Sequence, residues 1–337
     1  MATSNIQIPS LLKRKEITDD KVVLRVRRET VSCVNCGSDD HDVVHHFDQE
    51  YYNHEKYDTY SWDGGIPLDL TIVKCKGCAT VFQSPRFCEE SLHYLYPNHR
   101  LPEKLSYKRQ MQNHKFHFLI DLIRKHGTKS LHEKTAIDMG TRYGVLPELL
   151  ANEGYRSMGI EMNLKCVKLA NQAGFDHVHE GTVSDIDRLT KQQGMERVNL
   201  VTMVDIVEHL LDPRRDFELI SRHQQTGDQI FISTMDVDSL GHKIFGKNWY
   251  FLHAQHTYYF SEKTLGDLLD KFGYNIQYVH RIAKFKNLSI LPKEFKKLKR
   301  HNALRGAITP ERSNSKSWFA EYRPSLFDYM NIVAVKR

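Results

Sequence analysis

The chain has 337 residues, more than one small hydrophobic core usually covers, so we expect two structural units. Apolar residues make up 40%, enough for packed cores, and the net charge of +6 is too modest to require nucleic acid as a partner. The longest apolar runs are strand-sized and fall short of the ~20 residues of a membrane span. We therefore expect no membrane span and a cytoplasmic protein.

The first 25 residues mix charges into every turn and lack the apolar core of a signal peptide. We expect them to form a mobile tail. The region that follows is irregular and rich in Tyr, His and Asp, and regular alternation of strands and helices begins only after it. These shifts predict a small domain over residues 26–105 and a larger domain over residues 106–337.

Four of the six cysteines form two Cys-x-x-Cys pairs, Cys33 with Cys36 and Cys75 with Cys78. In a cytosolic chain such pairs are more often metal ligands than disulfides. Four thiolates close a tetrahedral Zn²⁺ site with no open position, which makes the predicted zinc structural. The competing ligands are three nearby histidines, His45, His46 and His54. The pattern predicts a small zinc-ribbon-like unit at residues 26–105.

The larger domain begins with a predicted helix over residues 107–126 and continues as alternating strands and helices. The predicted strands are 135–139, 157–161, 177–181, 198–204 and 229–234, with a closing antiparallel pair formed by 275–282 and 329–337. The predicted helices between them are 144–154, 163–174, 213–227 and 261–273. This α/β pattern predicts a doubly wound seven-stranded sheet that binds ligands at the carboxyl ends of its strands.

The stretch "AIDMGTRYGV", residues 136–145, is a glycine-rich turn between a strand and a helix. Its acid, Asp138, precedes the first glycine, and Glu161 ends the next strand about 20 residues later, the spacing of an acid that binds ribose hydroxyls. This arrangement suits a dinucleotide or S-adenosylmethionine. Arg142 replaces the middle glycine of the dinucleotide fingerprint. An acid at the turn would repel pyrophosphate but attract an ammonium or a sulfonium.

Four stretches in this order resemble the motifs of class I S-adenosylmethionine-dependent methyltransferases, which have a Rossmann-like fold. They are "AIDMGTRYGVLPELLANEGYRSMGIEMN", "HEGTVSDI", "VNLVTMVDIVEHLLDP" and "NWYFLHAQHTYYFSEKTLGDLLDKFGY". The resemblance covers residues 115–337. It implies that S-adenosylmethionine lies against the turn and strand ends, at Asp138, Gly140, Thr141, Gly144, Glu161, Met162, Thr182, Val183 and Asp205.

Within this group the chain is similar to sugar C-methyltransferases that carry a four-cysteine zinc unit before the methyltransferase domain. The run "HAQHTYYFS" places His256 on the residue that looks like the general base of that family. A histidine that titrates near neutrality suits removal of the acceptor's proton. His209, beside Glu208, is the second candidate. The resemblance predicts a small-molecule acceptor, a sugar, nucleotide sugar or glycan, methylated at oxygen or carbon.

Two other functions are consistent with the sequence. The first is an RNA methyltransferase whose zinc ribbon holds nucleic acid, although the acidic runs "GSDDHD" and "SWDGGIPLDL" near the cysteines would repel phosphate. The second is a non-enzymatic zinc scaffold with a decayed methyltransferase fold, which the retained Asp138, Glu161 and Glu208–His209 pair argue against. The basic run at residues 292–305 is either a solvated segment or a site for a phosphorylated substrate.

Overall fold

A computed structural model of the protein describes residues 28–47, 70–91, 104–111, 114–126, 134–249, 251–282 and 328–337. The expected mobile tail at 1–25, His54 and the basic run at 292–305 lie outside the described residues. No helix in the described part of the chain is long and apolar enough to cross a membrane.

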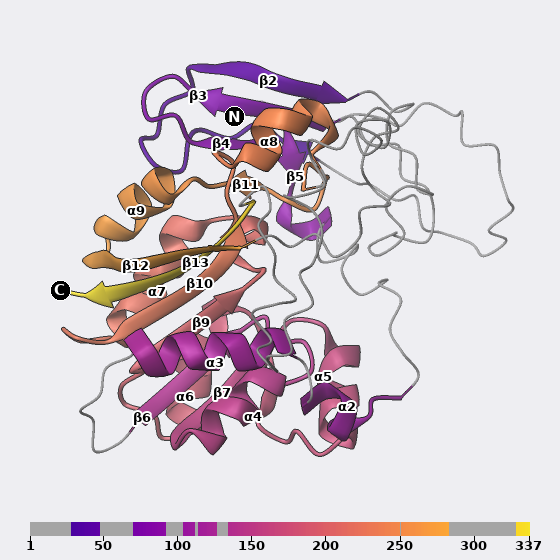
Figure 1. Cartoon of the computed structure of the whole chain (residues 1–337), viewed down its shortest axis with the longest axis vertical. Helices are drawn as coiled ribbons and strands as arrows, with labels where there is room; N and C mark the ends of the chain where they lie inside the picture. Colours follow the sequence, from indigo (N-terminus) through magenta and orange to yellow (C-terminus); the bar gives the residue numbers. More distant parts are fainter. Residues whose placement is uncertain are drawn as a thin grey trace, which may run out of the picture.

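The larger domain is built on a seven-stranded sheet in the order β12-β13-β10-β9-β6-β7-β8 (Figure 1). The five strands from β10 to β8 are parallel, and β13 is antiparallel to both β10 and β12. The predicted doubly wound sheet and its closing antiparallel pair are therefore confirmed. The strand bounds are Lys134–Met139 (β6), Tyr155–Glu161 (β7), Val178–Glu180 (β8), Leu200–Val204 (β9), Gln229–Met235 (β10), Tyr274–Ile282 (β12) and Tyr329–Lys336 (β13).

Helices cover both faces of this sheet, as the continuous apolar runs of its strands require. Successive residues of a strand point to opposite faces, so Ala136 packs with one helical layer and Ile137 with the other. The first layer holds α3 (His114–His126), α4 (Val145–Asn152) and α5 (Leu164–Gln172). The second holds α6 (Ile186–Gln192), α7 (Pro213–Arg222) and α9 (Glu262–Asp270).

One helix differs from the sequence-based expectation. Within 107–126 the structure describes α2 (Tyr107–Met111) and α3 as predicted, and residues 112–113 between them lie outside the described residues. The helix predicted over 213–227 ends at Arg222, and the side chain of Gln224 just beyond it bonds two backbone carbonyls at the starts of β9 and β10. Its amide nitrogen donates to Val198 O at 3.0 Å and to Gln229 O at 2.9 Å. A buried glutamine side chain that donates hydrogen bonds to carbonyls at strand ends is a tertiary feature, and helical periodicity in the sequence does not reveal it.

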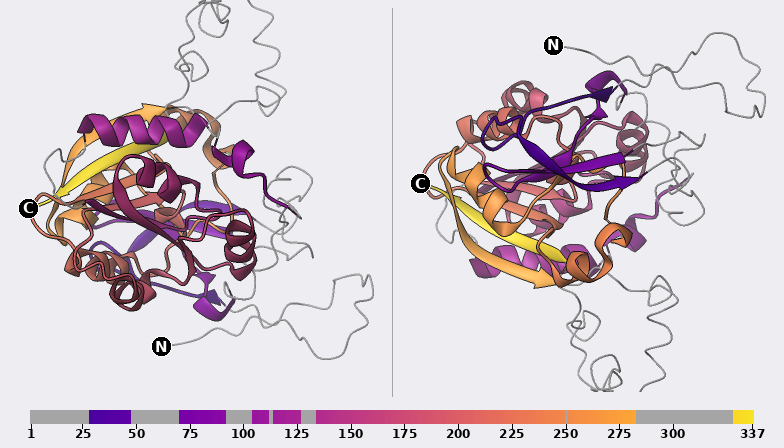
Figure 2. Two further views of the ribbon diagram at one scale, coloured as in Figure 1. Left: turned by 90° about the horizontal axis from the view of Figure 1, so that it is seen from below. Right: turned by 90° about the horizontal axis from the view of Figure 1, so that it is seen from above.

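The N-terminal unit is a four-stranded antiparallel sheet, and one of its strands comes from the larger domain. The order is β11-β4-β3-β2, with bounds Tyr258–Tyr259 (β11), Val81–Gln83 (β4), Leu70–Cys75 (β3) and His41–Phe47 (β2). A two-stranded pair, β1 (Arg28–Glu29) with β5 (Arg86–Phe87), lies beside it. Figure 2 shows these N-terminal strands lying across the end of the larger sheet.

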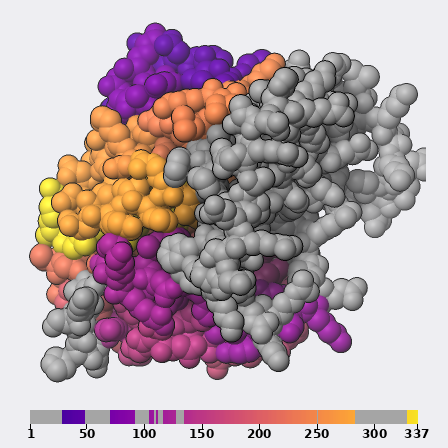
Figure 3. Space-filling view, viewed as in Figure 1, coloured from indigo at the N-terminus to yellow at the C-terminus, as the bar shows by residue number. Residues whose placement is uncertain are grey.

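Core residues of the N-terminal unit pack in the same cluster as residues of the larger domain. Val73 and Phe82 share a hydrophobic cluster with Leu265 of α9. The Asn35 side chain donates to Thr264 O at 2.8 Å, and both groups are buried. Figure 3 shows the surfaces of the N-terminal unit and of the segment around α8 (Leu240–Phe245) in contact on one face of the molecule. The two predicted units therefore share one sheet and one core.

Candidate cofactor, acceptor and metal sites

The glycine turn between β6 and α4 has the backbone that its sequence suggests. Gly140 and Gly144 have φ of 68° and 76°, in the left-handed region that favours glycine. A Cβ at Gly140 would come within 1.9 Å of Cδ1 of Ile206, which follows β9. Arg142, which replaces the middle glycine of the dinucleotide fingerprint, also adopts a left-handed φ of 56°. The turn keeps a glycine-like path there despite the larger residue.

Glu161 ends β7 directly beside this turn. Its Oε2 accepts the Arg142 N–H and its Oε1 accepts the Asn163 N–H, each at 2.8 Å. Burial raises the pKa of this carboxyl, and the backbone N–H groups of Asn163 and Arg142 oppose that rise. Because each carboxylate oxygen accepts more than one hydrogen bond, both can still receive a hydroxyl. The side chain is thus held in place for a diol such as ribose.

Two polar side chains of the turn are buried at the carboxyl end of β6. Asp138 accepts a hydrogen bond from the Thr202 hydroxyl at 2.6 Å. The Thr141 hydroxyl is buried and has no hydrogen-bond partner within the described residues. Buried hydroxyls are nearly always satisfied in folded proteins, so an unsatisfied one in this turn fits a polar ligand that supplies the bond. This observation is consistent with the residues proposed for S-adenosylmethionine.

The other predicted cofactor residues lie at the ends of neighbouring strands. Met162 follows β7, and Thr182 caps the short helix η3 (Val183–Asp185) just after β8, with Val183 buried beneath it. Asp205 follows β9 with a left-handed φ of 58°, and its N–H donates to Ser233 O at 2.9 Å. Since β6, β7, β8 and β9 are adjacent and parallel, these residues lie along one edge of the sheet.

The two predicted histidines lie together. The rings of His209 and His256 are 4.7 Å apart between centroids, although they come from different segments. His209 belongs to the short helix η4 (Val207–His209) after β9, and His256 precedes β11. The Nδ1 atoms of His209 and His256 each lie 2.8 Å from a backbone carbonyl, those of Gln255 and Phe251.

Glu208 completes this group, and it was absent from the sequence-predicted site. Ligand atoms of Glu208, His209 and His256 all lie within 4.8 Å of one another. The Glu208 side chain is only 1% exposed and accepts a hydrogen bond from the Thr234 hydroxyl at 2.8 Å. The Glu-His pair after the fourth strand was visible in the sequence. Its distance to His256 was not.

Trp249 and Tyr258, two large aromatic residues on either side of His256 in the sequence, are buried in the core. Trp249 packs against His242 and Phe251, with ring centroids 4.8 Å and 5.1 Å away. Tyr258 donates to Leu211 O at 3.2 Å and is contacted by Arg86, whose Nη1 lies 3.0 Å from the phenol oxygen. Packing is therefore the role that the structure gives these two side chains.

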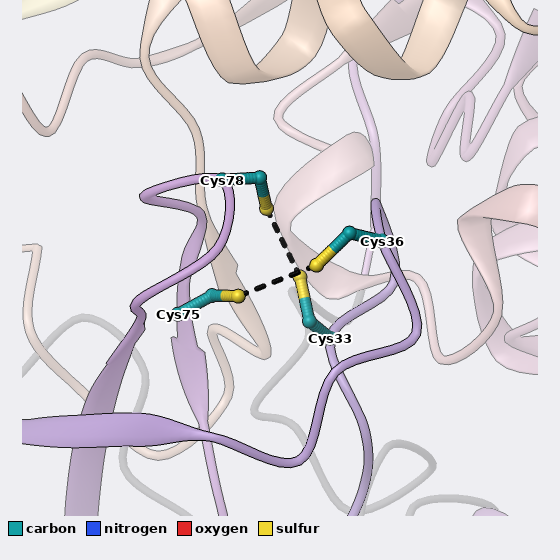
Figure 4. Close-up of side chains that lie close together, drawn as sticks. All are labelled: Cys33, Cys36, Cys75 and Cys78. Carbon is teal, nitrogen blue, oxygen red and sulfur yellow. Dashed lines mark hydrogen bonds between the residues drawn. The ribbon is translucent and has the colours of Figure 1, made fainter.

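The four cysteines of the two Cys-x-x-Cys pairs come together as predicted (Figure 4). Cys33 Sγ lies 3.3 Å from Cys78 Sγ, and Cys36 Sγ lies 3.4 Å from Cys75 Sγ. A tetrahedron with Zn–S bonds of about 2.3 Å has S–S edges of about 3.8 Å, so the donor set and spacing fit Zn²⁺.

The competing histidines of the described region lie away from the thiols. His45 Nε2 is 3.0 Å from His242 Nε2, and His46 Nδ1 is 3.0 Å from the Thr71 hydroxyl. Neither belongs to the group formed by the four cysteines.

Residues 107–279 match the family model described as a methyltransferase domain. The chain belongs to this family. The match covers β6 to β11 and α9, which include both the glycine turn and the two histidines.

Several relatives and solved structures with similarity to the chain are named as methyltransferases. The ubiquinone biosynthesis O-methyltransferase of Erwinia tasmaniensis is 26% identical over 126 residues, which are 36% of this chain and 49% of the relative. Its namesake in Nitrosomonas europaea is 30% identical over 110 residues, 32% of this chain and 46% of the relative. The chain thus spans about half the length of these curated relatives.

Among solved structures, magnesium protoporphyrin IX methyltransferase of Synechocystis PCC 6803, with bound SAH, is 13% identical with a TM-score of 0.44. The similarity covers 73% of this chain and 93% of that one. A methyltransferase from Archaeoglobus fulgidus is 20% identical, with a TM-score of 0.42 and coverage of 66% and 94%.

Proposed function

We propose that the protein transfers the methyl group of S-adenosylmethionine to a hydroxyl group of a small molecule. The observation that carries the proposal is Glu161, a buried carboxylate held by two backbone N–H groups beside the glycine turn. That arrangement favours an adenosine ribose over a pyrophosphate, and it lies inside the region that matches the methyltransferase family.

On the cofactor side, the chain's residues bind and orient. Glu161 accepts the two ribose hydroxyls, Met162 packs on adenine, and Thr182 with Val183 flanks its other face and edge. The remaining positions surround the methionine end and the methyl group: Asp138, Gly140, Thr141, Gly144 and Asp205. S-adenosylmethionine supplies an electrophilic methyl on a sulfonium that is already a good leaving group. The enzyme's task is then to align the acceptor and to remove one proton.

On the acceptor side, we assign that proton loss to the two histidines, with His256 first and His209 second. Their Nδ1 atoms face backbone carbonyls, which only accept, so each Nδ1 carries a hydrogen. The lone pair of each neutral ring is then on Nε2. His209 follows the strand end that borders the proposed methyl position, because η4 comes directly after β9 and Asp205, and the His256 ring lies beside that of His209.

The relatives support an oxygen acceptor over a carbon acceptor. Those named above are O-methyltransferases of ubiquinone biosynthesis, although they match less than half of their own length. A sugar or nucleotide sugar remains a prediction from the resemblance noted in the sequence. The charge around the cysteine turn is unfavourable for RNA, because Lys76 Nζ is paired with Asp40 at 2.8 Å and Asp42 at 3.5 Å.

For the four cysteines we propose a structural Zn²⁺ held by Cys33, Cys36, Cys75 and Cys78. The supporting observation is that four thiol sulfurs from two turns have ligand atoms within 4.8 Å of one another. With all four positions taken by protein, the ion has no position for substrate.

The deciding experiment is a labelled methyl-transfer assay. The protein is incubated with S-adenosylmethionine labelled in its methyl group and, separately, with phenols, free sugars, nucleotide sugars and RNA, and products are identified by mass spectrometry. We expect label on an oxygen atom of a small molecule, and loss of that signal in Glu161→Ala. Label appearing in RNA alone would overturn the small-molecule proposal.

A further inference from the structure

The group formed by Glu208, His209 and His256 has the composition of a metal site as well as that of a proton acceptor. We propose that these three residues bind a divalent cation, separate from the zinc of the four cysteines. The binding step stands by itself. Only the cation's effect on an acceptor hydroxyl rests on the function proposed above.

The first argument is the geometry of the donors. One carboxylate oxygen and two imidazole nitrogens, drawn from two segments of the chain, lie within 4.8 Å of one another. Three atoms that each lie about 2.1 Å from one ion are at most about 4.2 Å apart, so only small shifts would bring them to a common ion. The carboxylate is not an exposed surface acid, because Glu208 is 1% exposed and His256 is 5% exposed.

The second argument is the orientation of the rings. Metal-binding histidines usually donate their other ring N–H to a backbone carbonyl or a carboxylate, which fixes the tautomer. His209 and His256 both do so, through Nδ1 at 2.8 Å from Gln255 O and Phe251 O. Thr234 donates in the same way to Oε2 of Glu208. All three donors therefore have a supporting hydrogen bond in place.

The donor set indicates which cations fit. Two imidazoles with one carboxylate suit Zn²⁺, Mn²⁺, Fe²⁺ or Co²⁺, whereas Mg²⁺ and Ca²⁺ prefer sites made of oxygen alone. Three protein ligands also leave coordination positions for another molecule, as in catalytic metal sites. The four-cysteine site is the opposite case, since protein atoms fill it.

The cation would lie beside the proposed methyl position, because Glu208 and His209 follow β9 and Asp205 along the chain. Histidines bound to the cation would no longer act as direct bases, and an acceptor hydroxyl bound to the cation would instead have a lowered pKa and release its proton to solvent. The resulting oxygen attacks the methyl carbon, the C–O bond forms as the C–S bond breaks, and the products are a methyl ether and S-adenosylhomocysteine. This chemistry needs no oxidant or reductant, and it selects hydroxyl acceptors.

Cobalt substitution separates the two metal sites in the intact chain. The protein is stripped of metal, titrated with Co²⁺ alone and followed by absorption and elemental analysis. Thiolate-bound Co²⁺ shows intense sulfur-to-metal charge transfer, whereas Co²⁺ bound by nitrogen and oxygen shows only weak bands. We expect two Co²⁺ per chain in the wild type.

Glu208→Gln keeps the size of the side chain and its ability to accept from Thr234, and removes the charge. We expect it to bind one Co²⁺, to keep the thiolate band, and to weaken the second site by at least about 100-fold. His209→Ala is the second variant, with the same expectation. His253→Ala is the matched control, because its ring lies 3.6 Å from that of His256 yet is outside the ligand group, and it should still bind two.

The thiolate band reports the N-terminal unit and far-ultraviolet circular dichroism reports the larger domain, so loss of the second cation with both signals intact cannot be ascribed to unfolding. One Co²⁺ per wild-type chain would overturn the proposal. It would also be overturned if Glu208→Gln still bound two. Full methyl transfer by protein that holds only the thiolate-bound ion would overturn the cation's role and leave His256 as a direct base. The proposed function would survive that result, because it fails only if no acceptor is methylated.

Discussion

The cofactor side and the acceptor side of the candidate site are assembled in different ways. The cofactor side comes from consecutive β–α units, in which Asp138, Thr141 and Glu161 are separated by a single helix. The acceptor side joins segments far apart in sequence, with Glu208 and His209 after β9 and His256 before β11. The first is a local motif, and the second exists only once the chain has folded.

The N-terminal unit supports the acceptor side directly. The Gln83 N–H donates to Thr257 O at 2.8 Å, next to His256, and β11 is the edge strand of the N-terminal sheet. Arg86 donates to Leu211 O and to the Tyr258 hydroxyl. We therefore expect changes in the zinc unit to affect the acceptor side and to leave the cofactor side intact. Four variants test this difference, from the largest expected effect to the smallest.

His256→Ala should have the largest effect on turnover. If the acceptor loses its proton through His256, the turnover rate should fall by ~10²–10⁴. The affinity for S-adenosylmethionine should barely change, because its proposed contacts come from other strand ends. Steady-state kinetics and calorimetry measure the two quantities. His209→Ala is the comparison. If His256→Ala keeps near-normal turnover and His209→Ala loses most of it, then the acceptor loses its proton through His209 instead.

Glu161→Ala tests the cofactor side. Losing a charged acceptor for two hydroxyls should weaken S-adenosylmethionine binding by roughly 2–3 kcal/mol, as measured by calorimetry. Glu180→Ala is the matched control, since Glu180 is the register partner of Glu161 on the neighbouring strand and its side chain is exposed. Unchanged affinity for S-adenosylmethionine in Glu161→Ala would contradict the proposal that Glu161 accepts the ribose hydroxyls.

Cys75→Ser tests whether the zinc unit reaches the acceptor side. Elemental analysis should show loss of the thiolate-bound zinc, with weaker protection of residues 28–47 and 70–91 in hydrogen exchange. Because β4 carries β11 beside His256, turnover should fall by about 10–100-fold, the scale of a small misplacement of reacting groups. S-adenosylmethionine affinity should stay near the wild-type value. Cys88→Ser, outside the thiol group, should leave both zinc and turnover unchanged.

Tyr258→Phe should have the smallest effect. It removes one buried hydroxyl that donates to Leu211 O and accepts from Arg86, at a cost of about 1 kcal/mol in the free energy of unfolding. Denaturant titration measures this cost. Tyr107→Phe is the control on the cofactor side, where the exposed hydroxyl bonds Glu148, and we expect a smaller loss there. Equal losses in the free energy of unfolding would mean that the hydrogen bonds of Tyr258 at β11 contribute no more than the exposed one of Tyr107.

Much of the fold and half of the candidate site were predictable from sequence. Hydrophobic runs and glycine stops located the strands and helices because such signals are local. The glycine turn with Glu161 was predictable for the same reason, since one β–α–β unit contains it. The Cys-x-x-Cys pairs were equally readable, because the spacing within each pair sets a tight turn, and the two turns do meet.

The family resemblance suggested His256 and His209, but only the tertiary structure decided how the acceptor side is assembled. No local pattern indicates that Tyr258 and Tyr259 pair with β4, because a two-residue strand takes its conformation from its partner. Nor does any pattern place Glu208 next to His256, which needs the end of β9 and the segment before β11 to converge. The position of His45 beside His242, far along the chain and outside the thiol group, is likewise a tertiary feature. Local chemistry set the cofactor side, and long-range packing against the N-terminal unit set the acceptor side.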